Sequence, residues 1–450
     1  MLTLAVTGYF ALLTLEWVTV SGAAGGFVKP FHLGLVAVAA LAFLRWPVGR
    51  LVGPVLHRFA GIHGAYLLLV AVSLAGGLAF TNPYFSRSTG LRVLTYAVGS
   101  LVLAGVVARL ALEPRARRML ALAGAAAAVT VAVGITVGLA ATGANPLGVL
   151  GEALAKGDPD IVSNRLLRTA FRSNEDLADV GANLRHKVFL AVLLATFVGL
   201  AFMPSRHDRA DRSRRRLVMA ASVLGAVLVV LSLSRSTILC LAVAAALGPL
   251  RSIVRNRARP AQAIAAVVGL AVAAALLVSP VAELLGERFA ANRSYERRLA
   301  AAGPGFLDGF GGATLAGTTK GAVPTPHNLV LDAWLSGGVA AFVLAVVLLL
   351  SLAGLWLAMA RRYLRGRPGW HLPVGQQWVL GMGLIPLVRA FTAGNQFHMV
   401  EWSAIGVFTG LVLANERLAR ERRATEPGVA GRRRVPVEAA PRPEEVAACS

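Results

Sequence analysis

Long runs of apolar residues alternate with short clusters of charged residues along most of the chain. Because the apolar core of a bilayer is about 30 Å thick, a helix needs roughly 20 mostly apolar residues to cross it. Lipid cannot pair with backbone polar groups, so each such run predicts a helix. The sequence therefore predicts an all-α, polytopic integral membrane helix bundle. Its expected spans, about 12 in number, are residues 3–22, 31–46, 61–80, 91–110, 119–141, 187–203, 217–234, 236–250, 261–279, 329–360, 376–392 and 399–415.

The composition strengthens this interpretation. Of the 450 residues, 56% are hydrophobic and only 15% are charged, and the mean hydropathy is +0.66. A water-soluble fold of this size carries a larger share of charged residues. The two cysteines, Cys240 and Cys449, exclude a disulfide framework and a multi-cysteine metal site. We therefore expect a membrane protein without redox chemistry.

The distribution of positive charge predicts how the chain is oriented. Lys and Arg accumulate in the cytoplasmic connections of membrane proteins, and most of the 45 found here lie in alternate connections and in the C-terminal tail. This pattern predicts that both termini are cytoplasmic. The net charge of +23 then reflects orientation and contact with anionic membrane lipids, and it requires no nucleic-acid partner.

The same pattern divides the chain into two parts. Residues 1–415 are expected to form one transmembrane catalytic domain with long outer connections at about 142–186 and 280–326, and loops of that length are usually functional or disordered. The tail, 416–450, is rich in Arg, Glu, Pro and Ala, which predicts a disordered cytoplasmic extension. We interpret 3–22 as a retained helix because no basic segment precedes it, although the small residues that follow imitate a signal-peptidase site.

The absence of several known short motifs leaves some classes of enzyme without support. The sequence contains no Walker loop, no HExxH zinc motif, no GxSxG elbow and no GxGxxG after a strand. ATP-driven, metallopeptidase and dinucleotide-dependent activities therefore have no support. A multi-span secondary transporter of a polar or anionic solute stays open, since many carriers have this number of spans with both ends inside.

His327 is the first candidate for chemistry. It follows Pro326 at the point where the second long outer connection re-enters the membrane, and an imidazole suits proton transfer near neutral pH. Asn328 could cap the next helix or orient the histidine. The simpler alternative is that His327 and Asn328 only begin a helix, with Asn as its cap and His at the interface.

Arginines near the outer helix ends are the second group of candidates. Arg235 lies between two apolar spans and is flanked by serines, a position in which an arginine usually faces a polar cavity or an anion. Snorkelling to the interface is the alternative. Arg185 and His186 lie at the outer mouth of the span at 187–203, where an ordinary interfacial cluster is equally compatible with the sequence.

Further arginines could bind an anion at the same side. Arg293, Arg297 and Arg298 could contact phosphate bidentately, although Glu287 and Glu296 offer some of them a partner. A last group near the outer ends of the final two spans could line the same cavity, and it consists of Arg389, His398 and Glu401.

The order of these elements resembles the O-antigen ligase and O-antigen polymerase superfamily of bacterial envelope enzymes. An Asn–Arg element opens a span, a Ser–Arg–Ser element separates two spans, and a long outer connection with arginines and a Gly-rich turn leads through Pro–His–Asn into a span with Gly–Gly. The resemblance covers about 181–345 clearly and the rest by span count.

This resemblance implies a GT-C-like, inverting membrane glycosyltransferase at the outer face of the bacterial cytoplasmic membrane. Its donor would be an undecaprenyl-pyrophosphate-linked glycan, its acceptor a glycan, lipid or polymer, and no nucleotide sugar, metal or other cofactor would be needed. Arg235 and Arg185 would hold the pyrophosphate, with His186 as an alternative to Arg185. His327 would be the base that activates the acceptor hydroxyl. Polymerase and ligase both fit this resemblance.

Overall fold

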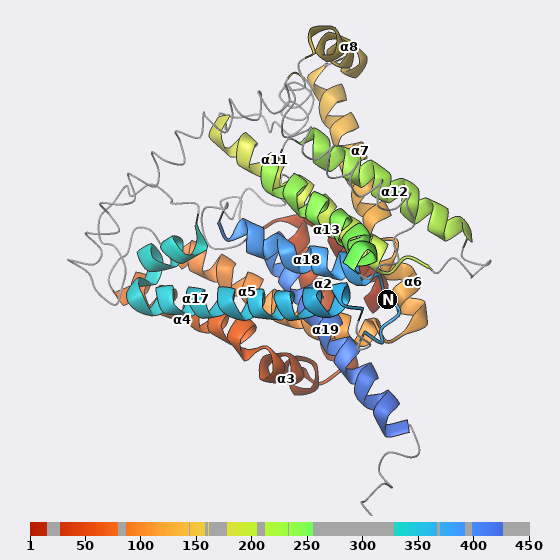
Figure 1. Cartoon of the computed structure of the whole chain (residues 1–450). Helices are drawn as coiled ribbons and strands as arrows, with labels where there is room; N and C mark the ends of the chain where they lie inside the picture. Colours follow the sequence, from red (N-terminus) through yellow and green to blue (C-terminus); the bar gives the residue numbers. More distant parts are fainter. Residues whose placement is uncertain are drawn as a thin grey trace, which may run out of the picture.

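The computed structural model describes much of the predicted domain (Figure 1). The described residues are 1–15, 28–79, 87–143, 145–157, 161, 178–204, 212–232, 234–254, 328–366, 370–391 and 398–425. Every regular element within these ranges is helical, which confirms the all-α prediction for this part of the chain. The predicted span 261–279 lies outside the described residues.

Several of the helices are long and apolar enough to cross a membrane, which indicates a membrane protein. Within the described ranges four helices meet this criterion, or up to five if a bent pair is counted as one span. The four are Arg92–Leu110, Pro114–Ala140, Ser236–Val254 and Leu329–Leu364. Shorter apolar helices cover Leu2–Leu13, Ala60–Ala75 and Lys187–Ala201. The total of about 12 spans stays a prediction.

Most of the helices follow the predicted runs closely, but the first helix ends at Leu13 although its predicted span extends to residue 22. In the first half of the chain they are α1 (Leu2–Leu13), α2 (Pro30–Arg45), α3 (Val48–Arg58), the π-helical turn η1 (Ala60–Gly64), α4 (Ala65–Ala79), α5 (Arg87–Leu110), α6 (Pro114–Leu120), α7 (Ala123–Thr142) and α8 (Pro146–Lys156). In the second half they are α11 (Ala178–Ala201), α12 (Arg212–Leu231), α13 (Arg235–Val254), α17 (Leu329–Leu364), α18 (Gln376–Arg389) and α19 (Met399–Thr425).

Small residues allow the central helices to pack closely. A Cβ atom at Gly406 or Gly410 of α19 would lie only 2.6 Å from the backbone oxygen of Ser100 or Ala104 in α5. Glycines four residues apart on one face let two helix backbones touch, which is how helices in a membrane commonly associate. The α5–α19 pair therefore forms a tight centre of the bundle. A second group, in which α7, α11 and α12 lie side by side, is visible in Figure 1.

Two segments predicted as connections contain helices. The first long outer connection, 142–186, includes α8 and the first turns of α11. Asn145 caps α8 by accepting hydrogen bonds from the backbone N–H groups of Leu147 and Gly148 at 3.1 and 3.2 Å. The other segment is α3, which is bent by 109° from α2. Both were missed because 10–12 residue helices carry a weaker apolar signal than a membrane span.

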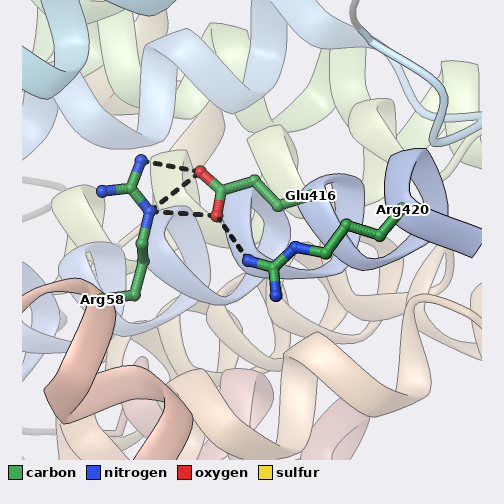
Figure 2. A network of polar contacts seen from close by, with 3 residues as sticks. All are labelled: Arg58, Glu416 and Arg420. Carbon is green, nitrogen blue, oxygen red and sulfur yellow. Dashed lines mark hydrogen bonds and ion pairs between the residues drawn. The ribbon is translucent and has the colours of Figure 1, made fainter. Parts of the chain in front are cut away.

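The predicted start of the tail at residue 416 is wrong, because α19 continues to Thr425. Figure 2 shows why its C-terminal part is held: Glu416 accepts hydrogen bonds from Arg58 Nε and Nη2 at 2.8–3.0 Å and lies 3.8 Å from Arg420 Nη2. The Arg420 contact joins successive helical turns, which favours helix. The rest of the tail, 426–450, lies outside the described residues.

The bundle has two polar ends. We call the first the Arg58 end, defined by Arg45, Arg58, Glu113 and Glu416. We call the second the Arg389 end, defined by Ser236, Asn328, Arg389 and Glu401. Glu401 and Glu416 belong to the same helix, and a rise of 1.5 Å per residue separates them by about 22 Å. This distance is comparable with most of the thickness of a bilayer's apolar core, which is about 30 Å.

Helix α17 is interrupted near the Arg389 end. Gly337 has φ −148° and ψ 18°, and Gly338 has φ 64° and ψ −154°, so the helical backbone breaks between two helical segments. Only glycine adopts the second conformation readily, because a side chain would be strained there. Ser336 and Ser73 of α4, both buried, form a hydrogen bond of 3.2 Å beside the break.

Candidate functional site

Arg389 is the centre of the Arg389 end. It is the last residue of α18 and it is buried. Its Nε donates a hydrogen bond of 2.9 Å to Oε1 of Glu401 in the first turn of α19. The side chains are 11% and 1% exposed, respectively. An ion pair held this far from water orients both groups strongly, since neither can turn to solvent without losing its partner.

The second Glu401 oxygen is available to another group. Oε2 is buried and has no hydrogen-bond partner among the described residues. A carboxylate can accept several hydrogen bonds, and burying part of that capacity is costly. The Arg389–Glu401 pair is therefore incompletely satisfied by the described side chains.

Arg389 connects α18 to the start of α13. Its Nη1 lies 3.5 Å from Oγ of Ser236, the second residue of that helix. Ser234 and Thr237, which flank the same turn, are buried and share a hydrogen bond of 2.7 Å. Arg235, the first residue of α13, lies between these buried hydroxyls; its backbone is described and its side chain is not. The Ser–Arg–Ser element is thus brought to the Arg389 end.

The start of α17 lies beside the same helix end. Leu329 N donates a hydrogen bond of 2.8 Å to the backbone oxygen of Ala390, directly after Arg389. The Asn328 side chain accepts from Val330 N at 2.9 Å and from Leu331 N at 3.4 Å. The interpretation of Asn328 as a helix cap is therefore confirmed. Its predicted contact with substrate stays a prediction.

Basic side chains from three other helices lie near His398 at the same end of the bundle. It immediately precedes α19, and the charges of Lys187, Arg389 and Arg92 all act on its imidazole. Lys187 follows Arg185 and His186 in α11, and Arg92 lies near the start of α5. Cations from α5, α11 and α18 therefore approach one another at this end of the bundle.

The predicted site residues fall into three groups. His327, Arg293, Arg297 and Arg298 lie outside the described residues. Arg185, His186 and Arg235 lie in helices whose backbone is described, while their side chains are not. Asn328 and Arg389 are described in full, and both lie at the Arg389 end.

Sequence reasoning missed two features of this site. Arg389 and Glu401 were both candidates for a cavity lining, but their pairing was not expected, and it alters the interpretation of Arg389 as a free cation for substrate. Arg92 was not selected. The signal that could have identified Arg92 is its position at the end of an apolar run, and Arg235 has the same kind of position.

No family model matches the chain, and no curated protein matches its sequence.

The arrangement favours binding of an anion. The N-terminal ends of α13, α17 and α19 meet at the Arg389 end, and the N-terminus of a helix carries a partial positive charge. Arg92 and Lys187 add full positive charges near His398. Helix N-termini and cations together form the usual protein environment for a phosphate group.

Proposed function

We propose that this chain is an integral-membrane glycosyltransferase that transfers or polymerises a glycan carried on undecaprenyl pyrophosphate. The observation that carries the proposal is the convergence at Arg389. Ser236 follows the arginine of the Ser–Arg–Ser element, Leu329 follows the Pro–His–Asn element, and both contact the end of α18. Motifs that are 90 residues or more apart in the sequence are expected to meet if they serve one site.

In this proposal the cations stabilise the leaving pyrophosphate. An acceptor hydroxyl attacks C1 of the donor sugar as the bond between C1 and the phosphate oxygen breaks, and the electron pair of that bond stays on the pyrophosphate. Arg235 and Arg185 neutralise the charge that develops there, and fixed donors in a site poor in water are most effective in this role. Lys187 and Arg92 extend the same field.

His327 takes the proton of the attacking hydroxyl in the same step. Histidine is suited to this role because it exchanges protons near neutral pH. It directly precedes Asn328, whose cap fixes the start of α17 beside Ala390. One displacement at C1 inverts the anomeric configuration. Arg293, Arg297 and Arg298 would contact the phosphates or the glycan from the connection before it.

The proposal also assigns the sides of the membrane. The protein would lie in the bacterial cytoplasmic membrane with both termini on the cytoplasmic side. Its Arg389 end would face outward and its Arg58 end would face the cytoplasm. Support comes from the arginines at the Arg58 end, where Arg45, Arg58, Arg109 and Arg420 lie among the described residues, in agreement with the excess of basic residues on the cytoplasmic side of membrane proteins.

Reconstitution tests the activity directly. Purified protein in liposomes without ion gradients receives a lipid-linked oligosaccharide, and the glycan products are separated by size. His327→Ala and Arg235→Ala should each reduce product formation by at least about a hundredfold, in line with the loss of a general base or of electrostatic stabilisation. Arg362→Ala, on the exposed surface of α17, is the control with a matched change of charge.

Wild-type product lengths and rates in both variants would contradict the proposal. Products elongated on the lipid carrier would indicate a polymerase, and a single transfer to a distinct acceptor would indicate a ligase.

A secondary transporter is the second candidate, and the break in α17 is the observation that favours it. Transporters often bind their substrate at interrupted helices near the middle of the membrane, and Gly337 and Gly338 interrupt α17 beside the buried Ser73–Ser336 pair. Uptake of a polar or anionic solute by the same liposomes under an imposed proton gradient, with no glycan product, would favour this class.

A further inference from the structure

The elbow between α2 and α3 holds two stacked arginines at the Arg58 end. The guanidinium carbons of Arg45 and Arg109 lie 4.8 and 5.0 Å from the ring centroid of Trp46. Stacking on an aromatic face stabilises a cation and fixes its orientation. Trp46 is partly exposed, and tryptophan is enriched at the boundary between lipid and water.

The arginines at this elbow exceed the acids that face them. Arg109 experiences the like charges of Arg417, Arg50 and Arg45. Among the residues that the structure describes, the acids that act on this group are Glu113, which pairs with Arg45 at 2.9 Å, and Glu421, which acts on Arg417. Glu416 is already bound to Arg58. The cluster therefore keeps a local excess of positive charge.

Arg109 is held in place while part of its bonding capacity is unused. Its Nη2 donates a hydrogen bond of 2.8 Å to the backbone oxygen of Arg50. Its Nε is buried and has no hydrogen-bond partner among the described residues. A guanidinium that is fixed by this bond and by the Trp46 ring is suited to the oxygen atoms of a phosphate group.

Apolar side chains border the same cluster. Leu44 and Val48, on either side of the elbow, are 85% and 55% exposed. Helix α3 is bent by 109° from α2, so the two helices run in nearly perpendicular directions at the elbow. Leu51 and Val55, on the other face of α3, are buried. Exposed apolar groups beside excess positive charge match a lipid, which has acyl chains next to a charged headgroup.

We propose that Arg50, Arg109 and Arg417, with Trp46 beside them, bind the phosphate of an anionic phospholipid headgroup. This site lies at the opposite end of the bundle from the proposed glycosyl-transfer site and does not depend on it. The lipid would also hold α3, α5 and α19 together, because its ligands come from these elements.

Lipid binding by the purified protein in detergent tests the proposal. Native mass spectrometry measures the affinity for phosphatidylglycerol and for phosphatidylcholine, which differ in net charge. The wild type should bind phosphatidylglycerol in preference. Arg50→Gln with Arg417→Gln should weaken that binding by about thirtyfold, since each of the two cations contributes about 1 kcal/mol near an anionic lipid.

A double variant with the same loss of charge provides the control. Arg362→Gln with Arg365→Gln removes two exposed arginines from the C-terminal end of α17, and it should leave the affinity within about twofold. Circular dichroism of both double variants shows that they are folded.

Three outcomes would overturn the proposal. The first is equal affinity for the two lipids. The second is an equal loss of affinity in the control variant. The third is displacement of phosphatidylglycerol by millimolar inorganic phosphate, because the cluster would then be a site for free phosphate instead of a lipid.

Discussion

Two arginine–glutamate pairs hold the opposite ends of this bundle, and they differ mainly in their environment. Arg389 and Glu401 are joined at 2.9 Å with side chains 11% and 1% exposed. Arg58 and Glu416 are joined at 2.8 Å with side chains 49% and 26% exposed. The second pair is the better bonded, since two guanidinium nitrogens bind Glu416.

The exposure of the two pairs to water, and not the geometry of their hydrogen bonds, decides how much each pair contributes to stability. Removing one member of a buried pair leaves a charge that neither water nor a partner stabilises, at a cost of about 3–5 kcal/mol. An exposed pair contributes about 0–1 kcal/mol because water replaces the partner. The end that carries the candidate site is therefore the end whose polar groups are hardest to change.

The largest effect is expected from Arg389→Met. The carboxylate of Glu401 would stay buried without its cation, so the free energy of unfolding should fall by about 3–5 kcal/mol. Unfolding in mixed micelles, titrated with sodium dodecyl sulfate and followed by circular dichroism, measures this change. A loss below about 1 kcal/mol would show that the two ends behave alike.

The double variant Arg389→Met with Glu401→Leu separates folding from function. Replacing both charges of a buried pair by apolar groups is often neutral for stability, so most of the stability should return. If Arg389 contributes to glycosyl transfer, the restored fold stays inactive. Recovery of both stability and activity would show that the pair has only a structural role.

Gly338→Ala is expected to have the next largest effect. The residue has φ 64° and ψ −154°, a conformation that strains any side chain, so the substitution should cost about 1–3 kcal/mol. Gly354→Ala is the control in the same helix, toward the Arg58 end, where a Cβ atom meets nothing within 4 Å. There alanine should stabilise the helix by up to about 1 kcal/mol. Equal effects at both positions would contradict the difference between the two parts of α17.

The sequence predicted most helices because their apolar runs are long and bounded by charge. The start of α17 was predicted at its observed residue, since Asn328 is a typical cap before an apolar run. The end of α19 was predicted too early. Residues 416–425 are rich in charged residues, a composition that is typical of a disordered tail. The sequence alone does not show that Glu416 pairs with Arg58 in a distant helix.

The candidate site was predictable only in part. The Ser–Arg–Ser and Pro–His–Asn elements were selected because polar residues beside apolar runs are costly in a membrane, and the helix starts that follow them both contact the end of α18. The contacts of Arg389 with Glu401 and Ser236 were not predictable, since they join different helices across connections. Such pairing depends on how the bundle packs, and the hydropathy of a single run carries no information about it.

Asn328→Ala should lower the free energy of unfolding by about 1 kcal/mol, because the first N–H groups of α17 lose their acceptor. Asn145→Ala removes the same type of cap from α8, whose N-terminal turn is exposed. Local fraying should absorb that change, so global unfolding should shift less. Hydrogen exchange at Val330 and Leu147 measures the two caps separately. Equal shifts in global stability would show that both caps belong to the same cooperative unit.

The smallest effect is expected from Glu416→Gln at the Arg58 end. Its partners Arg58 and Arg420 are 49% and 73% exposed, so water can solvate both once the carboxylate is removed. The free energy of unfolding should fall by about 0–1 kcal/mol, and raising the salt concentration to about 1 M, where charges are screened beyond about 3 Å, should reduce the difference further. The same micelle titration, run at low and high salt, provides the measurement. A loss near that of Arg389→Met, insensitive to salt, would mean that the Arg58–Glu416 pair is shielded from water by lipid or by residues outside the described ranges, and the contrast between the two ends would then no longer hold.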